Sequence, residues 1–337
     1  MAMLDDQLTI TAIIPLYNGA RFIEDSLNSV LAQTRPPQEI LVVDDGSTDD
    51  GAAVVERFIE KHPQVQLLRK ANGGQSAARN FAVKHSTGRL IALLDQDDMW
   101  YPHHLERLVE PFFKQRPIPL GWVYCNLDEV DITGQMVTRD ALRALSYVKH
   151  PKRDLLGCLQ TDMFVLPSAS LISREAFEAV GGFDESLSGF EDDDLFLRIF
   201  RAGYDNVYID EALTKWRIFT GSASFSARMA RSRMIYVRKL LEMFPDQPDR
   251  EFYYSRDAIA PRFLPWLVRE YMMALRRGDT ATALSAAEDL RFVAHYHRPR
   301  VRATVEMLTP ILRRPALART LLPVSDTVRP LLRRIFR

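Results

Sequence analysis

The first hundred residues alternate between short apolar runs and segments whose apolar side chains recur at helical spacing. The runs are rich in β-branched residues and lie at residues 9–17, 39–45, 65–70 and 89–94, with helical patterns at 21–32, 50–61 and 74–85. Strands that are separated by helices of ten or more residues form right-handed βαβ units. The pattern therefore predicts an α/β fold with a mainly parallel, Rossmann-like sheet.

Beyond residue 100 the same signals continue less regularly. Extended segments are expected at residues 120–130, 168–173 and 207–216. A helix is expected at 192–202, because Leu195, Ile199 and Ala202 share one face. Gly203 then stands where a C-terminal cap belongs.

The amino-acid composition of the sequence changes at about residue 226. From there on the chain is rich in Arg and reads as helical segments interrupted by prolines at positions 245, 261, 265, 299, 310, 315, 323 and 330. We therefore expect two domains, an α/β domain at residues 1–225 and an α-helical C-terminal region at 226–337.

Composition narrows the class of protein. Of the 337 residues, 47% are hydrophobic and 26% are charged, which is typical of a globular protein and not of a disordered or fibrous one. Two cysteines are too few for a disulfide framework. The first residues are acidic where a signal peptide would be basic, and no apolar run reaches 18 residues. These features predict a cytoplasmic protein, soluble or peripherally bound.

A formal net charge of zero hides an uneven distribution of charge. Residues 1–225 contain 22 basic and 33 acidic residues, a net charge of −11, whereas residues 226–337 contain 22 basic and 11 acidic residues, a net charge of +11. Such an asymmetry indicates that the two parts of the chain have separate roles.

Polar side chains follow each of the first four predicted strands. They are Pro15, Tyr17 and Asn18, then Asp44, Asp45 and Gly46, then Asn72, Gly73 and Gly74, and finally Asp95, Asp97 and Asp98. In an open α/β sheet, ligands bind outside the carboxyl ends of the strands. A ring for stacking, carboxylates for a base or a ribose, and further carboxylates for a cation together suit a nucleotide.

Most of these groups also have a simpler interpretation. The segment Asp44 to Ser47 has the composition of a turn and a helix cap, and Gly73-Gly74 is also typical of a helix start without a ligand. The acids at positions 95, 97 and 98 repel one another unless solvent or a cation relieves them. Carboxylates in this arrangement suit Mg²⁺ or Mn²⁺, the cofactor that we expect.

A second acidic cluster, Glu191 to Asp194, opens the predicted helix at 192–202. Carboxylates at a helix N-terminus are stabilised by the free N–H groups and by the dipole, so capping is the simpler interpretation. A carboxylate near a metal-bound diphosphate could instead act as a general base toward a hydroxyl. The residues alone favour capping.

Familiar alternatives lack their motifs. The first strand leads into Pro15-Leu16-Tyr17-Asn18-Gly19-Ala20 and not into Gly-x-Gly-x-x-Gly, and the chain has no Gly-x-x-x-x-Gly-Lys loop. A nucleotidyltransferase would need a Gly-rich loop and a lysine after the first strand, which are missing. The pairs His103-His104 and His295-x-His297 have no accompanying zinc ligands, so they are expected to be ordinary surface or helix residues.

Five segments, in order, resemble the inverting glycosyltransferases of family 2, which have the GT-A fold. They read IIPLYNGARFIEDSLNSVLAQT, EILVVDDGSTDD, NGGQSAARN, LLDQDDMW and GGFDESLSGFEDDDLFLRIFRAGY, within residues 8–225. The resemblance does not cover the C-terminal third. It implies metal-dependent transfer of one sugar from a nucleotide-sugar, with UDP-sugars favoured, to a hydroxyl of a glycan or lipid-linked acceptor in polysaccharide or glycoconjugate biosynthesis.

The resemblance also implies a role for individual residues. Asp97 would ligate the divalent metal, Asp192 would be the catalytic base, and Glu191 would help to orient the acceptor, which reverses the preference for capping. The residues implied at the nucleotide-sugar are Pro15, Tyr17 and Asn18 at the base and ribose, Asp45 at the base, Gly74 and Arg79 beside the nucleotide, Asp95 at the ribose, and Arg217 at the phosphates.

The sequence departs from the family pattern at one position. Many members carry an aromatic-Arg-x-His segment before a Gly-Ser pair, and here Phe219 stands where the histidine would be. Phenylalanine cannot bind a metal, so coordination would rest on Asp97, the diphosphate and water. A catalytically silent nucleotide-sugar-binding subunit of a glycan assembly complex is therefore the alternative function. The chain also lacks the Gln-x-x-Arg-Trp motif of processive synthases, which favours single addition.

The end of the chain is strongly basic. Residues 291–337 contain 11 basic and 2 acidic residues, and the last ten positions interleave apolar and cationic side chains. Such a segment suits the anionic inner face of a membrane, while a solvated tail or a helix packed on the acidic domain is an equal alternative. Nucleic-acid binding is not expected, because no recognisable module accompanies the charge.

Overall fold

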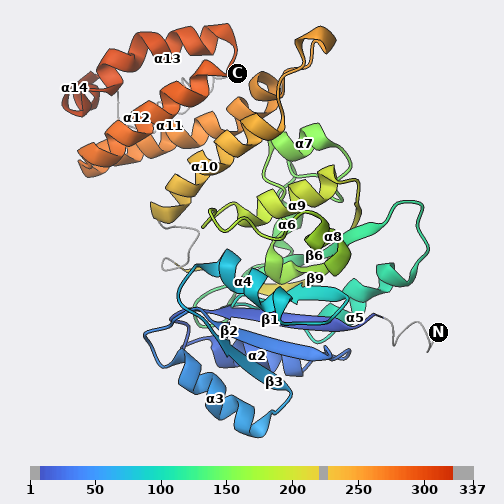
Figure 1. Ribbon diagram of the computed structural model, residues 1–337. Helices are drawn as coiled ribbons and strands as arrows, with labels where there is room; N and C mark the ends of the chain where they lie inside the picture. The colour runs from blue at the N-terminus through green and yellow to red at the C-terminus, as the bar shows by residue number, and fades with distance from the viewer. Residues whose placement is uncertain (1–7, 220–226, 322–337) are drawn as a thin grey trace. The chain divides into compact units, whose positions relative to one another are not determined.

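The computed structural model describes residues 8–219 and 227–321, and the chain forms two compact units. The first unit comprises Met1–Leu155 and Met163–Arg233, and the second comprises Leu156–Asp162 and Met234–Arg337 (Figure 1). The division of the chain thus lies a few residues beyond position 225, and a short segment from the middle of the chain belongs to the helical unit.

Within the described residues, the first unit contains one sheet of nine strands in the order β3-β2-β1-β4-β8-β6-β9-β5, with β7 paired to β6. The strands are β1 (Ile10–Leu16), β2 (Glu39–Asp44), β3 (Val65–Arg69), β4 (Leu90–Leu93), β5 (Met99–Trp100), β6 (Leu120–Val130), β7 (Met136–Thr138), β8 (Ser170–Ser173) and β9 (Asp205–Arg217). β1 to β4 are parallel, as is the pair β6 and β9. The predicted α/β fold with a mostly parallel sheet is confirmed.

Three strands, β5, β7 and β8, run against this pattern, and β8 is the one that lies between parallel strands. β8 is antiparallel to both of its neighbours, β4 and β6. It starts from the short 3₁₀ helix η2 (Pro167–Ala169), whose Ser168 hydroxyl accepts a hydrogen bond of 3.0 Å from the N–H of Asp95, just after β4 ends. β8 therefore begins at the edge where β4 finishes, and it must run in the opposite direction. The apolar pattern of residues 168–173 predicts a strand but not its direction.

Helices cover both faces of the parallel part of the sheet. Those of the first unit are α2 (Ile23–Leu31), α3 (Gly51–Lys61), α4 (Gln75–Lys84), α5 (His104–Val109), α6 (Ala141–Ala144), α8 (Arg174–Ala179) and α9 (Glu191–Arg201), with the 3₁₀ helix η1 at Glu110–Phe113. α2 and α3 lie on one face of the sheet and α4 on the other (Figure 1). This follows from right-handed crossovers, because the chain steps outward from β1 to β3 and then returns to β4.

The helix α9 differs slightly from its prediction. It spans Glu191–Arg201 and buries Leu195 and Ile199 as expected, but Ala202 is exposed beyond the last turn. The placement of Ala202 on the buried face was therefore wrong, because the helix ends one residue earlier. Gly203, with φ +92°, forms the expected C-terminal cap.

The second unit is helical. It contains α7 (Leu155–Gln160, from Leu156 on), α10 (Ala227–Met243, from Met234 on), the 3₁₀ helix η4 (Pro248–Arg250), the π-helical turn η5 (Ser255–Ile259), α11 (Ala260–Arg277), α12 (Thr280–His295), α13 (Pro299–Leu312) and α14 (Pro315–Leu321). α11 and α12 are neighbours, and both bury apolar side chains, among them Phe263, Leu267, Ala286 and Leu290. No helix among the described residues is long and apolar enough to cross a bilayer.

The prolines of this unit act in two ways. Pro299 and Pro315 open α13 and α14, where a missing N–H costs nothing. Pro265 and Pro310 instead lie inside α11 and α13, so the prediction that they interrupt helices was wrong. Pro265 is close to the π-helical turn that leads into α11, and Pro310 is in the last turn of α13. The prolines at 323 and 330 lie outside the described residues.

Candidate active site

The loops that follow β1, β2 and β4 are tied together by side-chain amides. Asn18 accepts hydrogen bonds from the N–H groups of Thr48 (2.8 Å) and Asp49 (3.3 Å), which joins the first loop to the second. Gln96 accepts from the N–H of Tyr17 at 2.8 Å and donates to its carbonyl at 3.1 Å, which joins the first loop to the third. The carboxyl ends of three strands therefore form one continuous surface.

The residues expected at the nucleotide occupy different depths on this surface. The Tyr17 side chain is 42% exposed, as a stacking ring must be, and Asn18 is exposed with φ +50°. Pro15 is buried within β1, where it pairs with Val43 of β2. Pro15 thus shapes the strand end from below, while Tyr17 offers a ring to solvent.

Asp45 is buried and already has partners within the protein. Its carboxylate accepts from Lys70 Nζ at 2.6 Å and from the N–H groups of Gly73 at 2.9 Å and Gly74 at 2.7 Å. Gly74 has φ +88°, which favours glycine, and a Cβ placed there would meet no atom within 4 Å. Asp45 therefore fixes the turn that begins α4, and open space lies beside Gly74. Lys70 was not predicted as a site residue.

A buried arginine joins two of the expected motifs. Arg79, on α4, is 1% exposed; it donates to Asp95 Oδ1 and, at 3.2 Å, to Glu191 Oε1. Gln75, one turn earlier on the same helix, also donates to Glu191. Asp95 and Glu191 are 96 positions apart in the sequence, and one guanidinium brings them together.

The charges in this cluster stabilise one another. Burial alone lowers the pKa of Arg79, but the carboxylates of Asp95 and Glu191 outweigh it and raise that pKa above its ordinary value. Burial raises the pKa of Glu191, and Arg79 opposes this shift. A buried charge of this kind needs its partners, so Arg79 holds the end of β4 next to the start of α9.

Asp97 and Asp98 have different environments. Asp98 is buried, and its Oδ1 accepts from the N–H of Arg217 at 2.9 Å. Burial, with Asp97 and Asp95 nearby, raises the pKa of Asp98 well above its usual range. Asp97 is only partly buried, and burial together with the charge of Asp95 raises its pKa to about 6. A cation beside Asp97 would favour the charged carboxylate, so the chemistry of this loop fits a divalent ion.

The part of the chain that the structure describes contains no group of three His, Cys, Asp or Glu side chains placed to hold a metal. A cation at Asp97 would thus take most of its ligands from elsewhere. This is usual for Mg²⁺, which keeps several waters and binds through one or two carboxylates and the phosphates of a substrate.

Arg217 does not face the open surface. It is 3% exposed, and its guanidinium donates to the carbonyls of Asp97 (2.9 Å) and Ile132 (2.8 Å) and to the carboxylate of Asp25 (3.0 Å). Its donors therefore hold the loop after β4 in place. Phe219 packs against Phe22 with ring centroids 5.4 Å apart.

The four acids at the start of α9 differ in how deeply they are buried. Glu191, Asp193 and Asp194 are buried, and only Asp192 is partly exposed. Asp193 accepts from the N–H of Met163 at 2.8 Å, and Asp194 forms an ion pair of 2.7 Å with Arg198. Three of the acids thus support the structure, and Asp192 is the carboxylate of this cluster that a substrate could reach.

Sequence reasoning missed several residues that hold the site together. Gln75 and Gln96 lie inside the motifs NGGQSAARN and LLDQDDMW, but an amide has no distinctive chemistry that singles it out there. Ser26, on α2, donates to the carbonyls of Gln96 and Asp98, each at 2.7 Å. A lone serine on a predicted helix carries no signal for this contact.

The chain is similar to a known family and to several known proteins. The sequence profile of the family described as Glycosyl transferase family 2 matches residues 11–181. The chain spans between about one third and two thirds of the length of the first curated relatives that it matches. One relative, the putative teichuronic acid biosynthesis glycosyltransferase TuaG of Bacillus subtilis, is 28% identical over 69% of this chain and 88% of its own length.

Two solved structures share the fold. The chain superposes on S. aureus TarS residues 1–349 in complex with UDP-GlcNAc with a TM-score of 0.64 and 17% identity, covering 96% of this chain and 92% of TarS 1–349. The mannosyltransferase PcManGT of Pyrobaculum calidifontis, in complex with GDP-Man and Mn²⁺, gives a TM-score of 0.57 and 23% identity over 93% of this chain and 87% of that one. The expectation of a GT-A fold is confirmed.

Proposed function

Because the chain belongs to glycosyl transferase family 2, and is thus a nucleotide-sugar transferase, we propose that it moves one sugar from a UDP-sugar to a hydroxyl of a glycan or lipid-linked acceptor, with inversion and with a divalent cation. The observation that carries this proposal is the buried Arg79. It links Asp95, in the loop expected to hold the cation and diphosphate, to Glu191, which is next to the partly exposed Asp192. One side chain therefore joins the loop that carries Asp97 to the helix start that carries Asp192.

Different residues would bind the nucleotide, hold the cation and accept the proton. Tyr17 offers a ring to the nucleobase, and the open space beside Gly74 admits the nucleotide. Asp97 would hold the cation, which neutralises the charge that develops on the leaving diphosphate. Asp192 takes the proton from the acceptor hydroxyl as that oxygen attacks the anomeric carbon from the opposite face. Direct attack of this kind inverts the configuration and needs no covalent intermediate.

For Arg217 we propose a role in holding a loop, in place of the expected contact with the phosphates. Its guanidinium holds the backbone at Asp97 and the carboxylate of Asp25, and its N–H holds Asp98. Arg217 is therefore a positioning residue for the loop that carries Asp97. Asp45 likewise positions Gly74 through its carboxylate, and a nucleobase would have to share that acceptor with Lys70.

The comparisons support the choice of donor and acceptor. TarS 1–349 is described with UDP-GlcNAc, PcManGT with GDP-Man and Mn²⁺, and TuaG is named for teichuronic acid biosynthesis. These descriptions favour a nucleoside diphosphate sugar, a divalent cation and a polysaccharide acceptor.

A screen of UDP-, GDP- and dTDP-sugars with Mg²⁺ or Mn²⁺ tests the proposal. We expect metal-dependent release of UDP from one UDP-sugar, faster with an acceptor, and a product of inverted anomeric configuration by NMR. Release of UDP at an unchanged rate in the presence of EDTA would contradict the role of the cation. Tight donor binding without turnover, for any sugar and acceptor, would instead support the silent binding subunit that Phe219 suggests.

The basic C-terminus is proposed to bind an anionic membrane surface. The last ten residues lie outside the described residues, which end at Leu321. The support is the charge of residues 291–337, with 11 basic and 2 acidic side chains. We expect the full chain to float with anionic vesicles at low salt and to float less at high salt. A chain without residues 310–337 should not float with the vesicles. Equal flotation of both proteins would contradict this role.

A further inference from the structure

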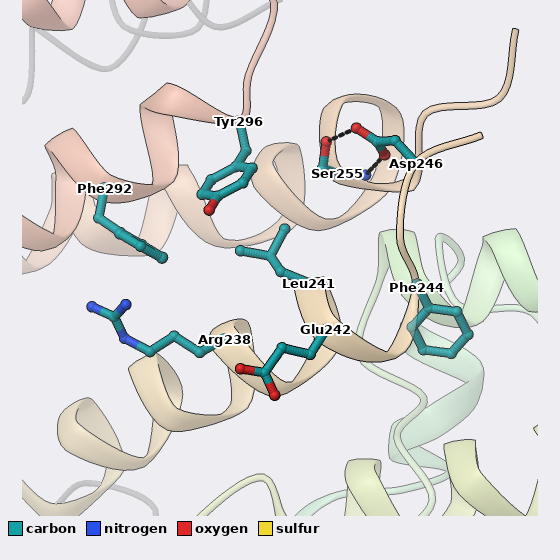
Figure 2. A pocket seen from close by; sticks show the side chains of 8 residues that line it. All are labelled: Arg238, Leu241, Glu242, Phe244, Asp246, Ser255, Phe292 and Tyr296. Atoms are coloured by element: carbon teal, nitrogen blue, oxygen red, sulfur yellow. Dashed lines mark hydrogen bonds between the residues drawn. The ribbon is translucent and has the colours of Figure 1, made fainter. Parts of the chain in front are cut away.

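The helical unit contains an open pocket of about 310 Å³. It is lined by residues of α10, the segment after it, η5 and α12, namely Arg238, Leu241, Glu242, Phe244, Asp246, Ser255, Phe292 and Tyr296 (Figure 2). Its volume is at the lower end of the range of about 300–1,000 Å³ for small-ligand sites. The pocket therefore suits a ligand of one or two rings.

One wall of the pocket is aromatic and is held in place by a cation. Phe292 on α12 and Tyr296, which directly follows the last residue of α12, have ring centroids 5.4 Å from each other, and Figure 2 shows both rings directed toward Leu241 on α10. The guanidinium of Arg238 lies 3.9 Å from the centroid of Phe292, a stacking contact that fixes a long side chain. Arg238 is exposed, and the N–H donors of its planar guanidinium lie at the edge of the pocket.

The opposite wall is polar and rests on an unusual piece of backbone. Asp246 accepts from both the N–H and the hydroxyl of Ser255, the first residue of the π-helical turn η5 (Figure 2). Turns of this kind are rare and occur frequently at functional sites. Glu242 is exposed on α10 and adds a second carboxylate to the lining.

This combination selects among ligand classes. The lining has two carboxylates and one guanidinium. A phosphate or a nucleotide is disfavoured there, because its negative charge needs several cationic side chains and is repelled by carboxylates. The charged side chains in the lining and the open shape disfavour an acyl chain. A neutral sugar matches this mixed lining, because its C–H face packs on aromatic rings, its hydroxyls donate to a carboxylate such as Glu242, and its oxygens accept from the guanidinium.

We infer that this pocket binds a neutral saccharide unit of the acceptor glycan, as a recognition site separate from the residues that carry the transfer. The inference rests on the proposed function, since the acceptor is defined by it. The pocket is built only from residues of the helical unit, so its affinity is a property of that unit.

Saturation-transfer NMR on the full chain, without donor or metal, tests the inference directly. The probes are methyl glycosides of glucose, galactose, mannose and N-acetylglucosamine and the corresponding disaccharides. We expect transfer to the ring protons of at least one probe, and a dissociation constant about tenfold higher in Phe292→Ala. Glu242→Gln and Arg238→Gln, at exposed positions where folding is easily kept, should each weaken binding several-fold.

Trp266→Ala is the matched control, since this exposed aromatic residue of the same unit does not line the pocket. It should leave saccharide binding unchanged. No signal for any probe with the wild-type chain, or equal losses in Phe292→Ala and Trp266→Ala, would overturn the inference.

Transfer assays separate this inference from the proposed function. In Phe292→Ala we expect a raised KM for the acceptor, with unchanged hydrolysis of the donor. Saccharide binding without transfer from any donor would contradict the proposed function and leave the pocket assigned. Transfer with an unchanged acceptor KM in Phe292→Ala would contradict the pocket alone.

Discussion

In the N-terminal unit the candidate site is held together by buried charged side chains, whereas in the C-terminal unit the pocket has charged side chains at exposed positions. Arg79, Asp98 and Glu191 are all buried, and each depends on a partner from a distant part of the chain. Arg238 and Glu242, by contrast, are exposed on one helix, α10.

This difference has consequences for how each unit tolerates change. Removing one member of a buried ion pair leaves an uncompensated charge in a medium of low dielectric constant. Removing an exposed side chain changes the local surface and little else. We therefore expect substitutions in the first unit to affect chemistry or folding, and substitutions around the pocket to affect ligand affinity.

The largest expected effect separates chemistry from folding within the first unit. Asp192→Asn should lower kcat by about 10³-fold, within the range for loss of a general base, and leave the free energy of unfolding nearly unchanged. Rapid-quench measurement of transfer, with urea unfolding of the same sample, checks both. Asp194→Asn is the control, because it weakens an ion pair with Arg198 and should reduce stability. Full transfer by Asp192→Asn would remove that residue from the mechanism.

The second prediction concerns the buried ion pairs. Arg79→Met should destabilise the first unit by about 3–5 kcal/mol, because Asp95 and Glu191 lose the cation between them. Arg107→Met, which removes an exposed arginine that pairs with Glu110 and Glu211, should have little or no effect. Similar unfolding midpoints for the two variants would mean that the buried cluster is not what holds the site.

A pH dependence follows from the buried His104 of the first unit. Burial lowers its pKa to about 3, and its ring stacks on Trp100 with centroids 4.6 Å apart. The unfolded side chain has a pKa near 6.5, so above pH 6.5 the imidazole is neutral in both the folded and the unfolded chain. As the pH falls from 6.5 toward 3, the unfolded chain binds a proton that the folded chain does not, and the free energy of unfolding decreases. Below pH 6.5 this histidine should cost about 1.4 kcal/mol per pH unit.

Urea unfolding between pH 7 and pH 4 measures this slope, and His104→Gln should flatten it. His103→Gln is the matched control, since it removes an exposed imidazole and keeps the buried one at position 104. An equal slope in wild type and His104→Gln would assign the acid sensitivity to other groups.

The smallest expected effect lies in the helical unit. Tyr271, buried on α11, donates its hydroxyl to the carbonyl of Leu312 at the end of α13, at 2.9 Å. Tyr271→Phe should cost about 1 kcal/mol, the usual net value of one hydrogen bond, because the apolar packing is kept. Thermal unfolding compared with Tyr296→Phe, a change at a partly exposed ring, checks it. A loss as large as that of Arg79→Met would show that the two units do not differ in this way.

Most of the fold could be predicted because its signals are local. The strands β1, β2, β3, β4 and β6 all lie within one or two residues of the apolar runs that predicted them. The motifs after each strand also lie at the expected edge, because parallel strands end on the same side of a sheet. His104 was expected to be an ordinary surface or helix residue and lies in a helix, but its complete burial beside Trp100 was not foreseen.

The candidate site could be predicted only in part. The sequence places four acids in a row at the start of α9, and no local rule says which of them faces a substrate. That depends on partners such as Met163 for Asp193 and Arg198 for Asp194. The pocket beside Phe292 carries no motif at all, because helices that are far apart in the sequence build it.

The sequence by itself determined the strand and helix pattern, the order of the motifs and the opposed charges of the two parts of the chain. These properties are set by side-chain periodicity and composition, which need no long-range contact. Only the tertiary structure decided that Arg79 joins Asp95 to Glu191, that Arg217 holds a loop, and that β8 runs antiparallel. Each of these depends on residues far apart in the chain, whose approach is fixed only when the sheet and its helices pack together.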